Sequence, residues 1–134
     1  MPGPRNSSII IKPWGSEETW ANTYYAMGRR LTIKPGHRLS RKYHRTKDLS
    51  VSVLEGTLIV EVGPLMKDAP VSQVSLSPGE GYFLEAGTIH RFSAGPDGAQ
   101  ILELSRQGAY DAVRLEDDYR RINSVPSRVP QSDK

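Results

Sequence analysis

The chain of 134 residues contains no cysteine, which excludes disulfide bonds and thiolate metal ligands. It has no apolar run long enough to form a transmembrane helix, and its opening residues (MPGPRNSS) lack the apolar core of a signal peptide. These absences predict a cytoplasmic protein that has no membrane partner.

Charge of one sign is also scarce, since 18 Lys and Arg residues face 15 Asp and Glu residues for a net charge of +3. The densest basic stretch runs from Arg38 to Lys47, and aromatic residues make up only 7% of the chain. A nucleic-acid surface needs more positive charge and aromatic side chains on which bases stack, so no nucleic-acid partner is expected. A local basic patch suits a small anionic or sugar ligand better.

Short apolar stretches separated by Gly and Pro turns are present along most of the chain. About nine short strands at this spacing predict an all-β sandwich or barrel. The Glu55-Gly56 pair is expected to be a hairpin turn between two of these strands. The charged segment from Tyr110 to Arg121 is expected to form a short helix or an irregular arm. The strands are expected at 8–12, 17–25 (one or two strands), 26–34, 49–54, 57–62, 71–76, 81–84, 88–93 and 100–105.

The composition predicts three regions. Residues 1–8 form a flexible leader, residues 9–121 form one folded domain, and residues 122–134 have the composition of a disordered tail.

The stretch from Gly36 to Gly56 carries the strongest signal for a functional site. Leu49 to Val53 alternates apolar and polar residues, which predicts a strand with one buried face. Lys42 and His44 precede this strand and share a face of extended backbone. A polar pair that leads into a buried apolar row is typical of a site in the mouth of a small β-barrel.

This stretch resembles the first sequence motif of the cupins, and Gly79 to His90 (GEGYFLEAGTIH) resembles the second. The opening KPWGSEETW, the segment PGHRLS and the closing ELS…DAVRLEDDYRR are similar to the C-terminal domain of type II mannose-6-phosphate isomerases. That group includes the bifunctional isomerase/mannose-1-phosphate guanylyltransferases. The resemblance covers residues 12–121. It implies a double-stranded β-helix (jelly-roll) barrel with a short N-terminal strand and a charged C-terminal arm, a homodimer, and a metal in the mouth.

Two metal-ligand positions of the motif are changed here. Lys42 replaces the first ligand, and an ammonium has no lone pair to offer. Leu49 replaces the glutamate, and the neighbouring Asp48 has the opposite parity and is expected to point outward. His44 and His90 remain as an incomplete metal site. The pair predicts at most a weakly held Zn, Mn, Fe or Ni ion and favours no bound metal.

Several residues in this region have more than one interpretation. Lys42 either binds an anionic substrate group, or acts as a base, or lies in solvent at the rim. His44 and His90 are either catalytic acid/base groups or hydrogen-bonded core imidazoles. Glu103, in the apolar run ILELS, lies in the pocket or on a solvent-facing side. Arg114 contacts substrate or pairs within the acidic run Asp111, Glu116, Asp117 and Asp118.

Other candidates are assigned mainly structural roles. His37 is expected in a turn, and Trp14 and Trp20 are expected to be core or interface anchors. Tyr24 and Tyr25 flank the barrel entrance in the resembled family, where one could be a general acid, although core packing is the simpler expectation. Glu85 takes the place of the second-motif proline in a turn.

The residues and the resemblance support a sugar or sugar-phosphate isomerase or epimerase with a degenerate metal site. His44 or His90 would transfer the proton, and Lys42 would stabilise an enediolate; Glu103 and Arg114 would bind substrate. Whether the chain is an enzyme at all stays open. The alternative is a non-catalytic small-molecule-binding cupin, a sensor or accessory protein that has lost its metal. A third hypothesis is a metal-dependent dioxygenase or isomerase in which water fills the missing ligand positions. The edge strand at residues 8–12 could swap between the two copies of a homodimer.

Overall fold

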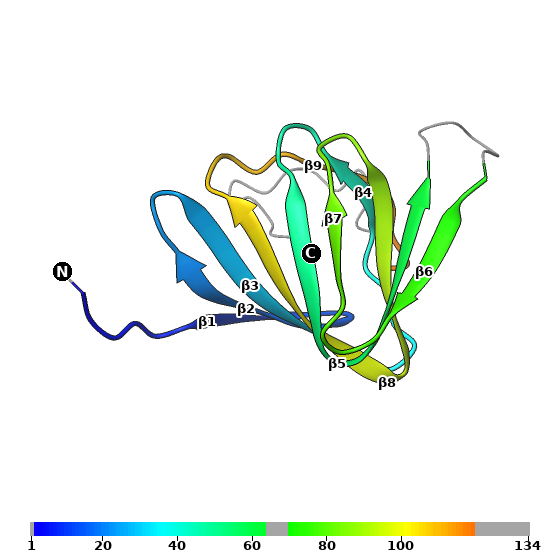
Figure 1. Ribbon diagram of the computed structural model, residues 1–134, viewed down its shortest axis with the longest axis horizontal. Helices are drawn as coiled ribbons and strands as arrows, with labels where there is room; N and C mark the ends of the chain where they lie inside the picture. Colours follow the sequence, from blue (N-terminus) through cyan, green and yellow to red (C-terminus); the bar gives the residue numbers. More distant parts are fainter. Residues whose placement is uncertain (1, 64–69, 120–134) are drawn as a thin grey trace.

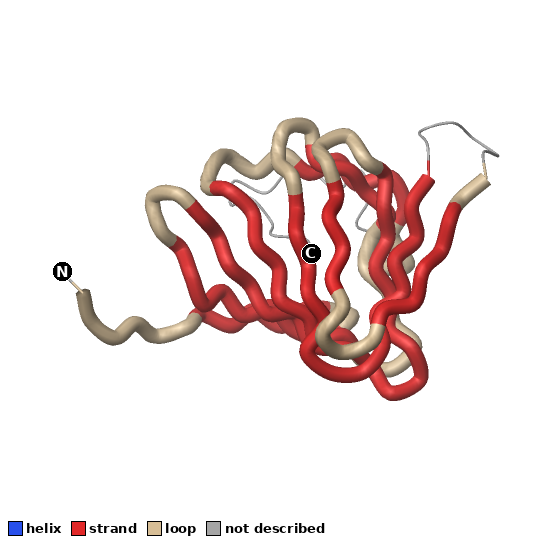
Figure 2. The backbone as a smooth tube through the Cα atoms, in the orientation of Figure 1, coloured by secondary structure: helices blue, strands red, loops and turns tan. Residues whose placement is uncertain are grey.

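The computed structural model describes residues 2–63 and 70–119, and in these ranges all regular structure is β-strand (Figure 2). The prediction of an all-β protein is therefore confirmed. The predicted tail lies outside the described residues. The strands are β1 (Ser8–Lys12), β2 (Gly15–Asn22), β3 (Ala26–Ile33), β4 (Arg41–His44), β5 (Leu49–Gly63), β6 (Ser72–Leu76), β7 (Gly81–Leu84), β8 (Ile89–Arg106) and β9 (Ala112–Glu116).

The strands pair antiparallel and form a curled sheet with two walls (Figure 1). The first wall contains β1, β2 and β3, then the C-terminal half of β8, the N-terminal half of β5, and β7. The second wall contains β9 and β4, then the N-terminal half of β8, the C-terminal half of β5, and β6. Two long strands, β5 and β8, therefore belong to both walls.

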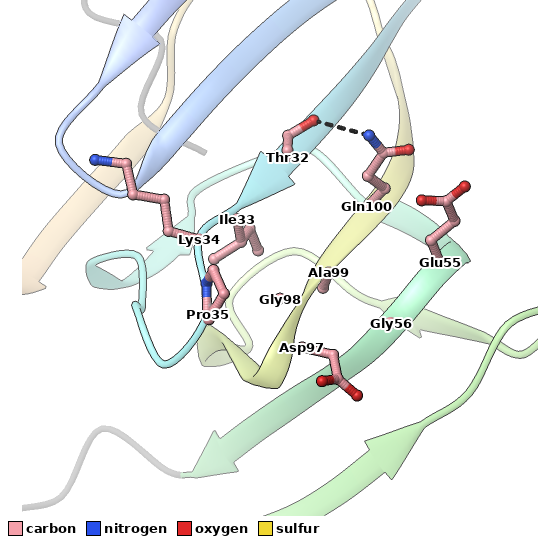
Figure 3. Close-up of a pocket in the computed structure, with 10 residues that line it drawn as sticks. All are labelled: Thr32, Ile33, Lys34, Pro35, Glu55, Gly56, Asp97, Gly98, Ala99 and Gln100. Carbon is pink, nitrogen blue, oxygen red and sulfur yellow. Dashed lines mark hydrogen bonds between the residues drawn. The ribbon is translucent and has the colours of Figure 1, made fainter.

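The predicted hairpin at Glu55-Gly56 is wrong, because β5 continues through it. Gly56 has a φ of 74° and lies where the register of β5 against β8 shifts, so it forms a bulge that bends the strand. The segment Pro96-Asp97-Gly98 forms a matching bend inside β8. Gly56 and Gly98 lie side by side at this double bend (Figure 3).

The C-terminal segment is a strand, so the expectation of a helix or irregular arm is wrong for residues 112–116. β9 pairs with β4, because Val113 and Leu115 alternate with polar residues and the open edge of β4 offers backbone hydrogen bonds. Ion pairs continue the attachment beyond the strand. Arg38 donates to Asp118 at 2.6 and 2.8 Å.

One end of the barrel, the mouth, carries the connections at residues 23–25, 45–48, 85–88 and 107–111 (Figure 1). The opposite end, the base, carries the double bend and the turns at 34–40 and 77–80. Among the buried charged residues of the interior, Lys42, His44 and His90 lie near the mouth ends of β4 and β8, whereas Glu17 lies near the base end of β2. The apolar core consists of Trp14, Leu31, Ile33, Leu39, Leu49, Val51, Val53, Leu58, Val60, Leu76, Leu84, Phe92, Ala94, Ala99 and Ile101.

The strand β1 lies at the edge of the first wall, and its isoleucines are exposed on both faces: Ile9 is 63%, Ile10 48% and Ile11 79% exposed. An exposed edge strand is a pairing surface. The homodimer expected from the resemblance stays a prediction.

We expect the Gly56→Ala variant to be strongly destabilised. A Cβ at Gly56 would lie 2.1 Å from the carbonyl oxygen of Gly98, and its φ of 74° is unfavourable for alanine. The left-handed backbone costs about 1 kcal/mol, and the steric clash should bring the loss of unfolding free energy to about 3 kcal/mol or more. Urea denaturation would measure this loss.

Gly79→Ala is the matched control, because Gly79 also has a positive φ of 89° but a Cβ added there would have no atom within 4 Å. Its loss should be about 1 kcal/mol, from the backbone term alone. Equal losses in the two variants would contradict a role for close contact at the double bend.

Candidate functional site

The alternating faces of β4 divide the basic stretch of the sequence into an inner and an outer set. Lys42 and His44 point inward and are 1% and 5% exposed. Arg41 points outward, where its guanidinium is 3.2 Å from Glu116. The stretch is therefore not one continuous basic patch.

Strand register brings four of the predicted site residues together on the inner face of the second wall. Lys42 is directly opposite His90 on β8 and opposite Arg114 on β9. His44 follows two residues later on the same face as Lys42. The side chains of His44 and His90 stack with ring centroids 5.9 Å apart and an interplanar angle of 16°.

Asp111 orients His44. The Nδ1 atom of His44 is 2.9 Å from Oδ1 of Asp111, and because an ionised carboxylate only accepts, Nδ1 carries the proton. The other oxygen, Oδ2, accepts the backbone N–H groups of Thr46 and Lys47, each at 2.9 Å, and the Thr46 hydroxyl at 3.1 Å. The turn between β4 and β5 thus encloses the carboxylate that fixes the His44 ring.

These hydrogen bonds keep Asp111 ionised. Burial alone would raise the pKa of Asp111, but the hydrogen bonds from His44 and from the backbone of Thr46 and Lys47 hold it well below its usual range. The carboxylate of Asp111 fixes the proton of His44 on Nδ1, so Nε2 is the ring nitrogen that is able to accept a proton.

His90 has a weaker orienting partner. Its Nδ1 is 3.0 Å from the carbonyl oxygen of Thr88, to which it must donate, and its ring packs at 5.2 Å from the ring of Phe92. A neutral carbonyl stabilises a protonated imidazole less than a carboxylate does. Of the two predicted histidines, His44 has the geometry of a general base.

The inner face of the first wall carries a second group of buried charges. Glu103 is 2% exposed and faces inward, which excludes the solvent-facing alternative. Arg29 is directly opposite Glu103 on β3. Its Nε lies 3.3 Å from Oε1 of Glu17, a residue of β2 that is 1% exposed.

Two of these residues were not predicted from the sequence. Asp111 had no spacing signal, because it stands in an acidic run that resembles a solvated surface. Glu17 did have one: in an extended strand two consecutive glutamates, Glu17 and Glu18, must point to opposite faces, so one of them faces the core.

The structure settles the orientation of three other candidates. Asp48 is exposed and accepts the N–H of Ala86 at 2.8 Å, as its parity predicted, and Leu49 is part of the core. Glu85 is exposed in the turn before β8. His37 lies in the turn that follows Lys34, with its Nδ1 3.0 Å from the Pro35 carbonyl oxygen.

The expectation of core packing for Tyr24 and Tyr25 is wrong. The two side chains are 87% and 80% exposed at the tip of the β2–β3 hairpin, where their rings contact each other edge to face at 4.9 Å. Trp14 is fully buried in the core as expected, whereas Trp20 is 47% exposed and covers Gly28 on the outer face.

A pocket beside the double bend lies at the base (Figure 3). Its rim includes Lys34, Glu55 and Asp97, and Gln100 donates to the Thr32 hydroxyl across 3.5 Å. None of the residues predicted as catalytic lines this pocket.

The donors present do not fit a tightly bound metal. Within the described residues, no three His, Asp or Glu side chains form a group that could hold an ion. The inner face offers two imidazoles, and the buried ammonium of Lys42 beside them opposes a cation. No helix able to cross a membrane occurs in the part of the chain that the structure describes.

A family model described as the mannose-6-phosphate isomerase C-terminal domain matches residues 5–124. No curated protein matches the chain.

Solved structures share the fold at low sequence identity. CapF, a capsular polysaccharide assembling protein from Staphylococcus aureus, has a TM-score of 0.73 and 16% identity over 84% of this chain and 32% of its own. KdgF from Halomonas sp. has a TM-score of 0.62 and 17% identity over 78% of this chain and 90% of its own. Oxalate decarboxylase from Lactobacillus farciminis has a TM-score of 0.65 and 16% identity over 79% of this chain and 32% of its own. This chain therefore spans about a third of CapF, and these likenesses show the fold alone. They confirm the predicted jelly roll.

We expect the Asp111→Asn variant to lose stability in a pH-dependent way. Folding lowers the pKa of Asp111, so the ionised carboxylate stabilises the protein fully above its unfolded pKa of about 4. That contribution is lost as the pH falls through the lower, folded-state pKa. The variant should be about 2 kcal/mol less stable at pH 7, and the deficit should shrink below pH 4.

Urea denaturation of both proteins between pH 7 and pH 3 would measure this difference. Asp48→Asn is the control, because Asp48 is exposed and accepts a single backbone hydrogen bond. A deficit that stays constant across this pH range, or one matched by Asp48→Asn, would argue against a charged Asp111 in the folded protein.

Proposed function

Because the chain belongs to the family of mannose-6-phosphate isomerase C-terminal domains, we propose that it is a cupin that isomerises or epimerises a sugar or sugar phosphate by proton transfer. The observation that carries this proposal is the His44–Asp111 pair, in which a buried carboxylate fixes the proton on Nδ1. Nε2 is then the ring atom that takes part in chemistry.

In this reaction His44 Nε2 removes the proton from the carbon next to a sugar carbonyl. The electron pair of the broken C–H bond forms an enediolate, and the negative charge collects on the carbonyl oxygen. Return of the proton to the former carbonyl carbon, with transfer of the hydroxyl proton from the neighbouring oxygen to the former carbonyl oxygen, gives the isomer. Protonation of the original carbon on its opposite face gives an epimer. Epimerisation needs a proton donor on that opposite face, whereas His90 lies beside His44 on the same wall, with the two rings stacked. The arrangement therefore supports isomerisation better than epimerisation.

Lys42 and Arg114 would hold the negative charge. They are directly opposite each other on β4 and β9, and Lys42 is 1% exposed, so its interactions with a ligand are little screened by solvent. Lys42 would stabilise the enediolate oxygen, and Arg114 would bind an anionic substituent such as a phosphate. This assignment needs no metal ion.

A carbohydrate substrate is supported by the family description and by the name of CapF, which assembles a capsular polysaccharide. The competing proposal is a cupin that binds such a ligand without converting it. The burial of Lys42 and His90 is compatible with both proposals, and the measurement of proton exchange separates them.

We expect His44→Asn to abolish proton exchange while leaving the fold intact. The asparagine amide can still donate to Asp111 but offers no basic nitrogen, so the exchange rate should fall about 100-fold or more. The measurement is loss of the substrate C–H signal by NMR in D2O, with aldose and ketose phosphates beginning with mannose 6-phosphate. His37→Asn, at the base of the barrel, is the matched control and should exchange at the wild-type rate.

If the substrate proton still exchanges in the His44→Asn variant, His44 is not the base. Binding of a sugar phosphate by the wild type with no exchange at all would favour the non-catalytic cupin.

We further expect proton exchange to be insensitive to chelators. The described donor set lacks the three ligands of a tight site, and Lys42 supplies the positive charge that a metal would otherwise provide. Rates measured after dialysis against EDTA, and again after addition of Zn, Mn, Fe or Ni, should agree with the untreated rate. A rate that disappears with EDTA and returns with one of these ions would support the metal-dependent alternative.

A further inference from the structure

Glu17 is a buried carboxylate that the proposed chemistry does not use. It is 1% exposed, and neither of its oxygens accepts a hydrogen bond from the described residues. Its one described charge partner is Arg29, 3.3 Å away, and the Nε–H of Arg29 makes no hydrogen bond either. An ion pair without hydrogen bonds offsets only part of the cost of burying a carboxylate. Both oxygens of Glu17 thus retain acceptor capacity.

The side chain of Glu17 points into the barrel. Glu17 is opposite the core residue Leu31, so it faces inward, and Arg29 is two residues from Leu31 towards the mouth. Arg29 also lies close to the mouth residue Lys47: burial lowers the pKa of Lys47, and the charges of Arg29 and Arg106 lower it further. The Glu17–Arg29 pair therefore extends from the mouth into the interior of the first wall.

The two walls differ in the sign of the charge that they offer to a ligand. The second wall presents Lys42 and Arg114, which attract an anionic group. Glu17 on the first wall repels an anion and accepts hydrogen bonds. A carboxylate whose two oxygens accept no other hydrogen bond can accept from two neighbouring hydroxyl groups at once, and such bonds to a charged acceptor are the stronger kind.

From this arrangement we propose that Glu17, held by Arg29, is the subsite for a vicinal diol of the substrate. The inference rests on the proposed function and adds an orientation to it. The anionic end of the ligand faces Lys42 and Arg114, and two adjacent hydroxyl groups donate to Oε1 and Oε2 of Glu17. The substrate class is therefore an anionic polyol, and an anion that lacks hydroxyl groups binds only to the second wall.

The test compares two probes by calorimetric titration: mannose 6-phosphate, which carries an anion and vicinal hydroxyl groups, and methyl phosphate, which carries the anion alone. In Glu17→Gln we expect the affinity for mannose 6-phosphate to fall about tenfold or more, because hydrogen bonds to a charged acceptor are lost. The affinity for methyl phosphate should be unchanged. Glu18→Gln is the matched control, because Glu18 pairs with Arg30 on the outer face, and it should change neither affinity.

Circular dichroism and thermal denaturation would establish that the variants fold. Should Glu17→Gln not fold, Glu17→Asp keeps the charge but withdraws both oxygens by one methylene, and it should show the same selective loss. Equal affinity of the variant and the wild type for mannose 6-phosphate would overturn the subsite, as would a wild type that binds mannose 6-phosphate no better than methyl phosphate or binds neither probe.

The proposed function and the diol subsite can be disproved independently of each other. If the wild type binds mannose 6-phosphate in a manner that depends on Glu17 but exchanges no substrate proton, the catalytic proposal is wrong and the diol subsite stands. If exchange depends on His44 while Glu17→Gln binds and exchanges like the wild type, the diol subsite is wrong and the catalytic proposal stands.

Discussion

The architecture depends on β5 and β8 bending together. Each strand belongs to both walls, so neither can bend unless its partner bends at the same level. Gly56 and Gly98 meet at this level, and the space between them leaves no room for a side chain on Gly56. Because the double bend lies at the base, the walls are tightly joined there. Towards the opposite end, β4, β8 and β9 carry the candidate site, and the turn after β4 holds the carboxylate that orients His44.

Side chains alternate between the two faces of a strand, and this alternation decides whether each charged side chain points into the barrel or away from it. On β4 the inward residues Lys42 and His44 enter the interior, while the outward Arg41 pairs with Glu116 of the C-terminal segment. Arg38 and Arg91 similarly pair with Asp118. The outer cations are thus neutralised by the protein itself. The cations that face the interior are a small part of the basic stretch visible in the sequence.

Much of the fold was predictable because its signals are local. Alternation, Gly and Pro turns, and the two motifs predict the strands and the inward direction of Lys42, His44 and His90. The prediction of a hairpin at Gly56 and the expectation of a helix or irregular arm at residues 112–116 were wrong for one reason. A positive-φ glycine forms either a turn or a bulge, and a charged segment forms a strand only if an open edge is available. Both outcomes depend on partners distant in sequence, β8 and β4, which local patterns do not reveal. Asp111 was missed for the same reason.

The pairing of β9 with β4 links the outside of the molecule to the chemistry inside. Asp111 immediately precedes β9, and its carboxylate is enclosed by Thr46 and Lys47, which closely follow β4. The His44–Asp111 contact therefore exists only while β9 lies along β4. The exposed ion pairs made by Glu116 and Asp118 help to keep it there, although none of their atoms approaches His44. Each such surface pair is worth about 1 kcal/mol or less, but Asp118 is shared by Arg38 and the buried Arg91, and a network of this kind holds a strand better than isolated pairs do. The C-terminal segment thus acts as a positioning element for the candidate base.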